Sequence, residues 1–386
     1  MADLAYIIQQ FGAQLIAKEQ LSIQQQKALL NIVRCRTATL GWHEERCDHC
    51  AQARYSYNSC GDRHCPKCQN TKQAIWVEDL VNATLPIQHF HVVFTVPHSL
   101  NGIYLWNQQL YCQILFKAMW ATLHSFGYTH YGVETGCVAI LHTWGQNLSL
   151  HPHLHCIIPA AGYTLQGKWK SIGKNGRYLF PVNQLSTVFK GKFLDSMSRQ
   201  LRKLNAFGFN HHLQQADNTD WVVNSEPSLA TPDKVMHYLG QYTHRVAISN
   251  QRILEVSDTH VRFIAKDYHD KAKKKPVRLQ GVEFLRRFCM HVMPKRFVKI
   301  RRFGIYNKTV IRNYHLQLKP QTKPDIEAIA LKLKPETKTE RILRLTGFDC
   351  LQCPKCKRGR MVSIKRMPRI RSPAISYRIM LMAEIN

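Results

Sequence analysis

The stretch that decides the interpretation of this chain is His151-Pro152-His153-Leu154-His155-Cys156, followed by the apolar run Ile157-Ile158-Pro159-Ala160-Ala161-Gly162. The apolar run predicts a buried strand. Side chains alternate between the two faces of a strand, so His153 and His155 point the same way, about 7 Å apart, while Leu154 turns into the core. Two imidazoles on one side of a rigid strand provide half of a divalent-metal site. An isolated His-x-His pair more often has a structural role than a metal-binding one. Here the downstream stretch Tyr238–Arg245, described below, favours metal binding.

The charge balance of the 386 residues points to a polyanionic partner. Fifty-four Lys and Arg stand against 25 Asp and Glu, which gives a net charge of +29 and a pI near 9.8. A cationic surface of this size most often binds nucleic acid. The alternative is a soluble protein that is merely basic.

The N-terminal residues and the cysteines indicate a protein of the reducing cytoplasm. Polar residues interrupt every apolar run in 1–27, so neither a signal peptide nor a membrane span is expected there. The spacing instead predicts an amphipathic helix with Leu4, Ile7, Ile8, Phe11 and Leu15 on its apolar face. Without an export signal, the thirteen cysteines are expected to be thiols and metal ligands in a reducing compartment.

Two Cys-x-x-Cys pairs, Cys47/Cys50 and Cys65/Cys68, are separated by 14 residues. This spacing is typical of a zinc ribbon, and it predicts a structural Zn²⁺ bound by these four thiolates, with folding and DNA contact as its role. Further candidate ligands are Cys60, Cys35, His43 and His64, so the number of ions stays open between one and two. A C-terminal group, Cys350, Cys353 and Cys356, provides only part of a second zinc site, and its remaining ligand must come from elsewhere.

The pattern of helices and strands favours an α+β fold with a central antiparallel sheet. Strands are predicted at 89–97, 135–144 and in the histidine stretch, with the last two joined around Gly145–Asn147 into an antiparallel pair. Helices are predicted at 71–84, 104–124 and 183–204, a short strand at 221–223, and a hairpin of 253–256 with 261–265. Regular strand–helix–strand alternation is missing, which argues against a parallel sheet. We expect a zinc-binding, DNA-contacting module at 1–86, a catalytic domain at 87–310, and a linker with a basic tail at 311–386.

A helix predicted to begin at Thr231-Pro232 carries Tyr238 and Tyr242 on one face. A phenol oxygen can attack a backbone phosphate of single-stranded DNA and leave a 5′-phosphotyrosine and a free 3′-hydroxyl. Arg245, Lys234 or a metal would lower the tyrosine pKa, and phosphate chemistry suits Mg²⁺ or Mn²⁺. Gln241, His151 and His91 are the candidates for a third metal ligand beside His153 and His155.

A basic segment follows this helix. From Arg262 to Arg302 there are 14 Lys and Arg, interleaved with Phe284, Phe288 and Phe297. Such a pattern favours a groove that follows a phosphate backbone. The residues expected to contact DNA are Arg245, Lys273, Lys274, Lys275, Arg301 and Arg302.

Several stretches together resemble the transposases of the bacterial insertion-sequence family ninety-one. HTWGQ through HPHLHCIIPAAG looks like the HUH (His-hydrophobic-His) motif of these rolling-circle enzymes, and YLGQYTHRVAIS is similar to their two-tyrosine motif. SCGDRHCPKCQ resembles their zinc-binding module, FHVVFTVPHSL their first catalytic strand, and EFLRRFCMHVMPKRFVKIRRFG the segment after the tyrosines. The resemblance runs from about Cys35 to Gly304. It implies an HUH catalytic domain in which His153 and His155 bind the metal and Tyr238 and Tyr242 are the nucleophiles.

This resemblance also implies the substrate, which is single-stranded DNA at the ends of a transposable element and target DNA. It further implies a bacterial cytoplasmic protein associated with the nucleoid. Two alternatives remain. A replication initiator or relaxase would use the same chemistry, and a non-catalytic zinc-finger protein would bind DNA without ever forming a covalent adduct. A zinc hydrolase is disfavoured because the histidine stretch contains no glutamate.

Overall fold

The computed structural model describes residues 3–82, 85, 87–173, 179–229, 246–267, 270, 272–307, 336–369 and 377–385. The predicted tyrosine helix, with Lys234, Tyr238, Gln241, Tyr242 and Arg245, lies outside these residues. In the part of the chain that is described, no helix combines the length and apolar character that a membrane crossing requires.

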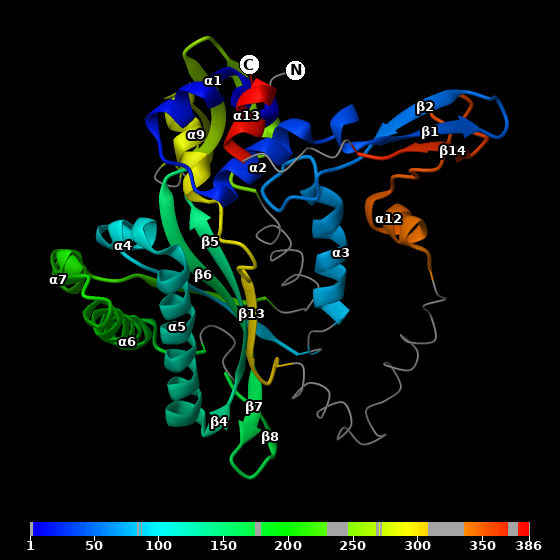
Figure 1. Ribbon diagram of the computed structural model, residues 1–386. Coiled ribbons are helices and arrows are strands. Elements are labelled where there is room, and N and C mark those ends of the chain that lie inside the picture. Colours follow the sequence, from blue (N-terminus) through cyan, green and yellow to red (C-terminus); the bar gives the residue numbers. More distant parts are fainter. Residues whose placement is uncertain are drawn as a thin grey trace.

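The centre of the molecule is a five-stranded sheet with every neighbouring pair antiparallel (Figure 1). Its order is β13 (Ile300–Gly304), β5 (Gly136–Trp144), β6 (Leu150–Pro159), β3 (His89–Thr95) and β9 (Val223–Leu229). The predicted α+β class, antiparallel sheet and pairing of the histidine strand with the strand before it are therefore confirmed. The short strand expected at 221–223 instead begins at Val223 and continues to Leu229.

One face of this sheet is covered by two long helices, α5 (Gln108–Tyr131) and α6 (Val182–Lys203). Leu154 of the histidine strand is fully buried on that face, as the strand alternation predicted. Phe94 of β3 meets Phe189 of α6 edge to face, with ring centroids 5.0 Å apart. The helix expected from Tyr104 is interrupted at Asn107, which separates α4 (Asn101–Trp106) from α5. The Asn107 side chain accepts a hydrogen bond from Leu110 N and so caps the start of α5.

A second core joins helices from both ends of the chain. α1 (Leu4–Lys18) begins at the N-cap Asp3 and buries Leu4, Ile7, Ile8, Phe11 and Leu15, as predicted. It packs with α2 (Ile23–Arg34), α9 (Gly281–Met290) and α13 (Tyr377–Ile385), beside the three-stranded sheet of β10 (Ile253–Val256), β11 (His260–Asp267) and β12 (Lys273–Gln280). Figure 1 shows the first and last helices side by side.

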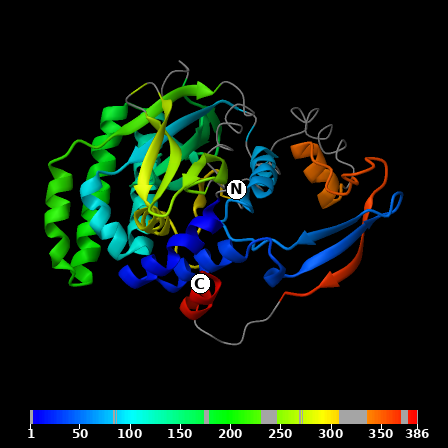
Figure 2. The same ribbon diagram turned by 90° about the horizontal axis from the view of Figure 1, so that it is seen from above.

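An arm extends away from these two cores (Figure 2). It is a sheet in which β1 (Trp42–Cys47) pairs with β2 (Ala53–Tyr57) on one side and β14 (Met361–Met367) on the other. Beside it, α12 (Lys338–Thr346) lies against α3 (Gln69–Asn82), where Arg341 and Arg344 form ion pairs with Glu78 at 2.7 and 2.5 Å. Residues 336–369 of the segment expected to be a linker and basic tail thus contain regular secondary structure, because the N-terminal module supplies backbone and carboxylate partners for their basic residues. Residues 308–335, which include the expected linker, lie outside the described residues.

The remaining described elements are short. β4 (Val133–Glu134), β7 (Ala161–Thr164) and β8 (Trp169–Ser171) form a small sheet at one end of the molecule, and α7 (Asn210–Asp217) follows α6.

Candidate metal centre

Three histidines meet on the face of the central sheet opposite α5 and α6. The ring nitrogens of His142, His153 and His155, one from each residue, lie within 4.8 Å of one another. His153 and His155 share a face of β6, as predicted, and the register pairs His142 of β5 directly with His153. A buried group of three nitrogen donors has the size and chemistry of a metal site.

The ring orientations direct the Nε2 atoms of β6 toward a common point. The His153 Nδ1–H donates to the carbonyl oxygen of His151 at 2.6 Å, which leaves the Nε2 lone pair available for a metal. The Nε2 atoms of His153 and His155 are 3.1 Å apart. Two protonated nitrogens would repel at this distance, whereas two lone pairs can share a cation.

His155 is held from behind by two further residues of the same sheet face. Its Nδ1 lies 3.0 Å from Nε2 of His91, and the His91 Nδ1 lies 3.1 Å from a carboxylate oxygen of Glu226. A carboxylate can only accept here, so His91 donates through Nδ1 and accepts from the His155 Nδ1–H through Nε2. This chain fixes the tautomer of His155 that presents Nε2 to the cluster.

Burial favours the neutral form of the imidazoles of His153 and His155 by lowering their pKa values. It lowers the pKa of His153 to about 4, and the neighbouring His151 acts in the same direction. The pKa of His155 lies far below its usual range because of burial and, after that, because of His142 and His153. Neutral imidazole is the form that binds metals.

The third histidine differs from the three candidates that the sequence suggested. The His151 ring lies 5.4 Å from that of His98 and is not one of the grouped ligands, and His91 supports His155 from behind. Gln241 lies outside the described residues. The predicted hairpin gave a partial signal for His142, because it brings the end of β5 beside the histidines of β6; the exact pairing with His153 depends on a register shift between His142 and Trp144.

Eight of the thirteen cysteines fall into two groups of four, which corrects the predicted pairing. Cys65 and Cys68 lie with Cys35 and Cys60, and the Sγ atoms of Cys35 and Cys60 are 3.4 and 3.6 Å from that of Cys68. Cys47 and Cys50 do not join them and lie with Cys353 and Cys356 instead. Four thiolates are a structural zinc set, and the group around Cys65 fits it. Among the described residues, Cys350 belongs to neither group.

The basic residues expected to contact DNA have different surroundings. Lys275 forms ion pairs with Asp267 and Asp270 at 2.9 and 3.0 Å, Lys273 lies 3.2 Å from Asp270, and Lys274 is exposed. Arg301 stacks on Phe116 of α5, on the helix-covered face of the sheet. Arg302 lies opposite Val138 in the register and so shares the face of the histidines. Arg245 lies outside the described residues.

Comparison with known proteins relates this chain to transposases. A family model described as "Transposase zinc-binding domain" matches residues 7–96, which include the group around Cys65, and one described as "Putative transposase" matches residues 136–313, which include the three histidines. No solved structure matches the chain significantly.

Two curated relatives match over most of their length. The chain is 37% identical over 386 residues to "Putative transposase y4qJ" of Sinorhizobium fredii, covering 96% of this chain and 97% of the relative. It is 25% identical over 344 residues to "Transposase for insertion sequence element IS801" of Pseudomonas savastanoi pv. phaseolicola, covering 85% and 81%. The chain belongs to the insertion-sequence 91 family of rolling-circle HUH transposases.

Proposed function

We propose that this transposase cleaves and rejoins single-stranded DNA at the ends of its element through Tyr238 and Tyr242. The observation that carries the proposal is the buried group of three histidines on the face of the central sheet opposite α5 and α6. A divalent cation held by His142, His153 and His155 would polarise the scissile phosphate and stabilise the charge that develops on it. Mg²⁺ prefers oxygen ligands, whereas transition metals accept imidazole, so Mn²⁺ fits this donor set better.

In the proposed reaction, the phenol oxygen of one tyrosine attacks the phosphorus and loses its proton. The bond from phosphorus to the 3′-oxygen breaks, and that oxygen leaves as a 3′-hydroxyl after taking up a proton. The product is a 5′-phosphotyrosine, which a 3′-hydroxyl from a second strand can attack in turn. Two tyrosines allow one to hold a strand end while the other cleaves the next strand.

The test is to incubate the full-length protein with labelled single-stranded DNA from the ends of its element, with and without Mn²⁺ or Mg²⁺. We expect an adduct that survives SDS, requires the cation, and is lost in Tyr238→Phe/Tyr242→Phe while DNA binding remains. Tyr55→Phe/Tyr57→Phe is the matched control, because both side chains are exposed on the arm. An adduct that persists in the first variant would refute the assignment of the nucleophiles.

The same experiment separates the alternatives. A non-catalytic zinc-finger protein would bind the ends with strong salt dependence and form no adduct. A replication initiator or relaxase would form the same adduct and could pass the strand to a 3′-hydroxyl, but it would cleave its own origin sequence rather than the two ends of an element. Joining of element ends to a target strand is the outcome expected of a transposase.

A further inference from the structure

The second group of cysteines joins residues from opposite ends of the chain. The Sγ atoms of Cys47 and Cys356 are 3.7 Å apart, as are those of Cys50 and Cys353, although these pairs are separated by 309 and 303 residues. All four sulfurs lie within 4.8 Å of one another. In a tetrahedral site with Zn–S bonds of about 2.3 Å, neighbouring sulfurs are about 3.8 Å apart. The observed spacing is that of a four-thiolate zinc site and is too long for disulfides.

Backbone amides are directed at these sulfurs from both segments. The N–H groups of His49 and Cys50 donate to Cys47 Sγ at 3.4 Å each, and that of Gly359 donates to Cys356 Sγ at 3.3 Å. Hydrogen bonds of this kind stabilise the thiolate form that zinc requires. Each Cys-x-x-Cys therefore has the local geometry of half a zinc site, and each half lacks two ligands without the other.

The two segments fit closely around the cysteines. Asp48 accepts from Arg360 N through its carboxylate at 2.7 Å and donates its own N–H to the Arg360 carbonyl at 3.1 Å. A side chain at Gly359 would begin 2.4 Å from Cys47 Sγ, so glycine is needed where the C-terminal loop crosses the N-terminal one. At the other end of β14, a Cβ at Gly41 would lie 2.5 Å from the Met367 carbonyl oxygen.

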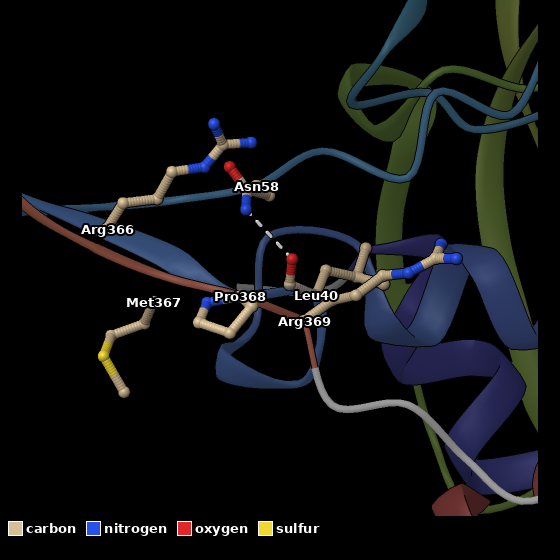
Figure 3. Close-up of a pocket in the computed structure, with 6 residues that line it drawn as sticks. All are labelled: Leu40, Asn58, Arg366, Met367, Pro368 and Arg369. Atoms are coloured by element: carbon tan, nitrogen blue, oxygen red, sulfur yellow. Dashed lines mark hydrogen bonds between the residues drawn. The ribbon is translucent and has the colours of Figure 1, made fainter.

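The base of the arm shows the same interlocking (Figure 3). A cavity of about 450 Å³ there is lined by residues of both segments, namely Leu40 and Asn58 from the N-terminal one and Arg366, Met367, Pro368 and Arg369 from the C-terminal one. Asn58 Nδ2 donates to the Leu40 carbonyl at 3.0 Å and fixes the loop against which β14 ends. The contact between the segments thus extends along the whole strand.

We infer that Cys47, Cys50, Cys353 and Cys356 bind a zinc ion of their own, distinct from the ion expected at Cys35, Cys60, Cys65 and Cys68. The zinc-binding family match ends at residue 96 and the transposase match at 313, so neither includes Cys353 or Cys356. The second ion closes the arm and attaches the C-terminal segment 336–369 to the N-terminal module. Its role is independent of the tyrosine chemistry proposed above.

The test is the zinc content of the purified full-length protein, measured by elemental mass spectrometry. We expect two ions per chain in the wild type. Cys47→Ser/Cys50→Ser and Cys353→Ser/Cys356→Ser should each lose one ion, and the variant that combines all four substitutions should lose no more than one. Cys350→Ser is the matched control and should retain two, because Cys350 is close to Cys353 in sequence but is not one of the grouped cysteines.

One ion in the wild-type protein would overturn the inference, as would two ions in Cys353→Ser/Cys356→Ser. A single ion shared by Cys47, Cys50, Cys65 and Cys68 would leave the C-terminal variant with an unchanged zinc content. The wild-type count tests the inference even if a variant fails to fold. Limited proteolysis adds a second measurement, in which loss of the ion should expose the C-terminal segment to cleavage.

Discussion

His91 offers a sharp test of the candidate metal centre, because it is expected to act on a cation only through His155. Replacing it by leucine removes the acceptor that lies 3.0 Å from the His155 Nδ1. Both residues are buried, with 1% and 6% of their surface exposed. Removing the partner of a buried donor costs about 1–3 kcal/mol. Loss of a residue that supports a metal ligand weakens metal binding by about 10- to 100-fold, or about 1.4–2.7 kcal/mol, and the two estimates agree.

The assay is a calorimetric titration with Mn²⁺ of protein whose cysteine sites already hold zinc. We expect His91→Leu to weaken Mn²⁺ binding by about 10- to 100-fold. Glu226→Gln should weaken it less, because the Glu226 side chain is 37% exposed and its charge is screened by solvent. Because Glu226 acts through His91, adding Glu226→Gln to His91→Leu should cause little further loss.

The matched control is His89→Leu. His89 is buried on the same strand and sheet face, but its Nε2 meets the Tyr306 hydroxyl rather than the histidine group. This variant should lose stability and keep the Mn²⁺ affinity of the wild type. Wild-type affinity in His91→Leu, or fully additive losses in the double variant, would refute the proposed chain from Glu226 to His155.

Three further predictions concern stability. Burial lowers the pKa of His291 from 6.5 to about 3. The unfolded chain therefore binds a proton that the folded protein does not, and the free energy of unfolding should decrease as the pH falls from 6.5 toward 3. Urea unfolding should show a decrease of about 2 kcal/mol between about pH 7 and about pH 5 that is absent in His291→Gln. A wild-type loss equal to that of the variant would contradict this. Leu154→Ala, which empties a fully buried position under α5, should cost about 2–5 kcal/mol in the same assay, and a cost below about 1 kcal/mol would contradict the core described here. Gly41→Ala should lower the melting temperature more than Gly347→Ala. Both glycines have positive φ, but of the two only Gly41 has backbone atoms within 4 Å of the added Cβ. Equal shifts in melting temperature would show that β14 does not pack over Gly41.

The sequence was informative wherever one local pattern determines the geometry. Strand alternation was enough to predict that His153 and His155 share a face and that Leu154 is buried. His142 was not predicted as a ligand because the hairpin contains a register shift between His142 and Trp144. A shift of one residue changes which side chain of β5 faces the site.

The cysteine groups show where local patterns stop being sufficient. Spacing identified each Cys-x-x-Cys as half of a zinc site, but connectivity depends on which segments meet in space. Cys47/Cys50 and Cys65/Cys68 are the two Cys-x-x-Cys pairs that lie nearest to each other in the sequence, but they belong to different groups. The basic C-terminal run resembled a tail because its strand, β14, exposes most of its side chains, and only the ladder to β1 reveals it as part of a sheet.

The junction between the two ends of the chain also determines the order of events during synthesis. Cys50 leaves the ribosome 303 residues before Cys353. At about 5–20 residues per second, the N-terminal thiols wait roughly 15–60 s for their partners. The central sheet, whose strands lie between these positions, can therefore form first, and the arm is completed only after Cys353 and Cys356 have been synthesised. A chain terminated before Cys353 would carry an open half-site, so a closed arm shows that synthesis of that chain has passed Cys356.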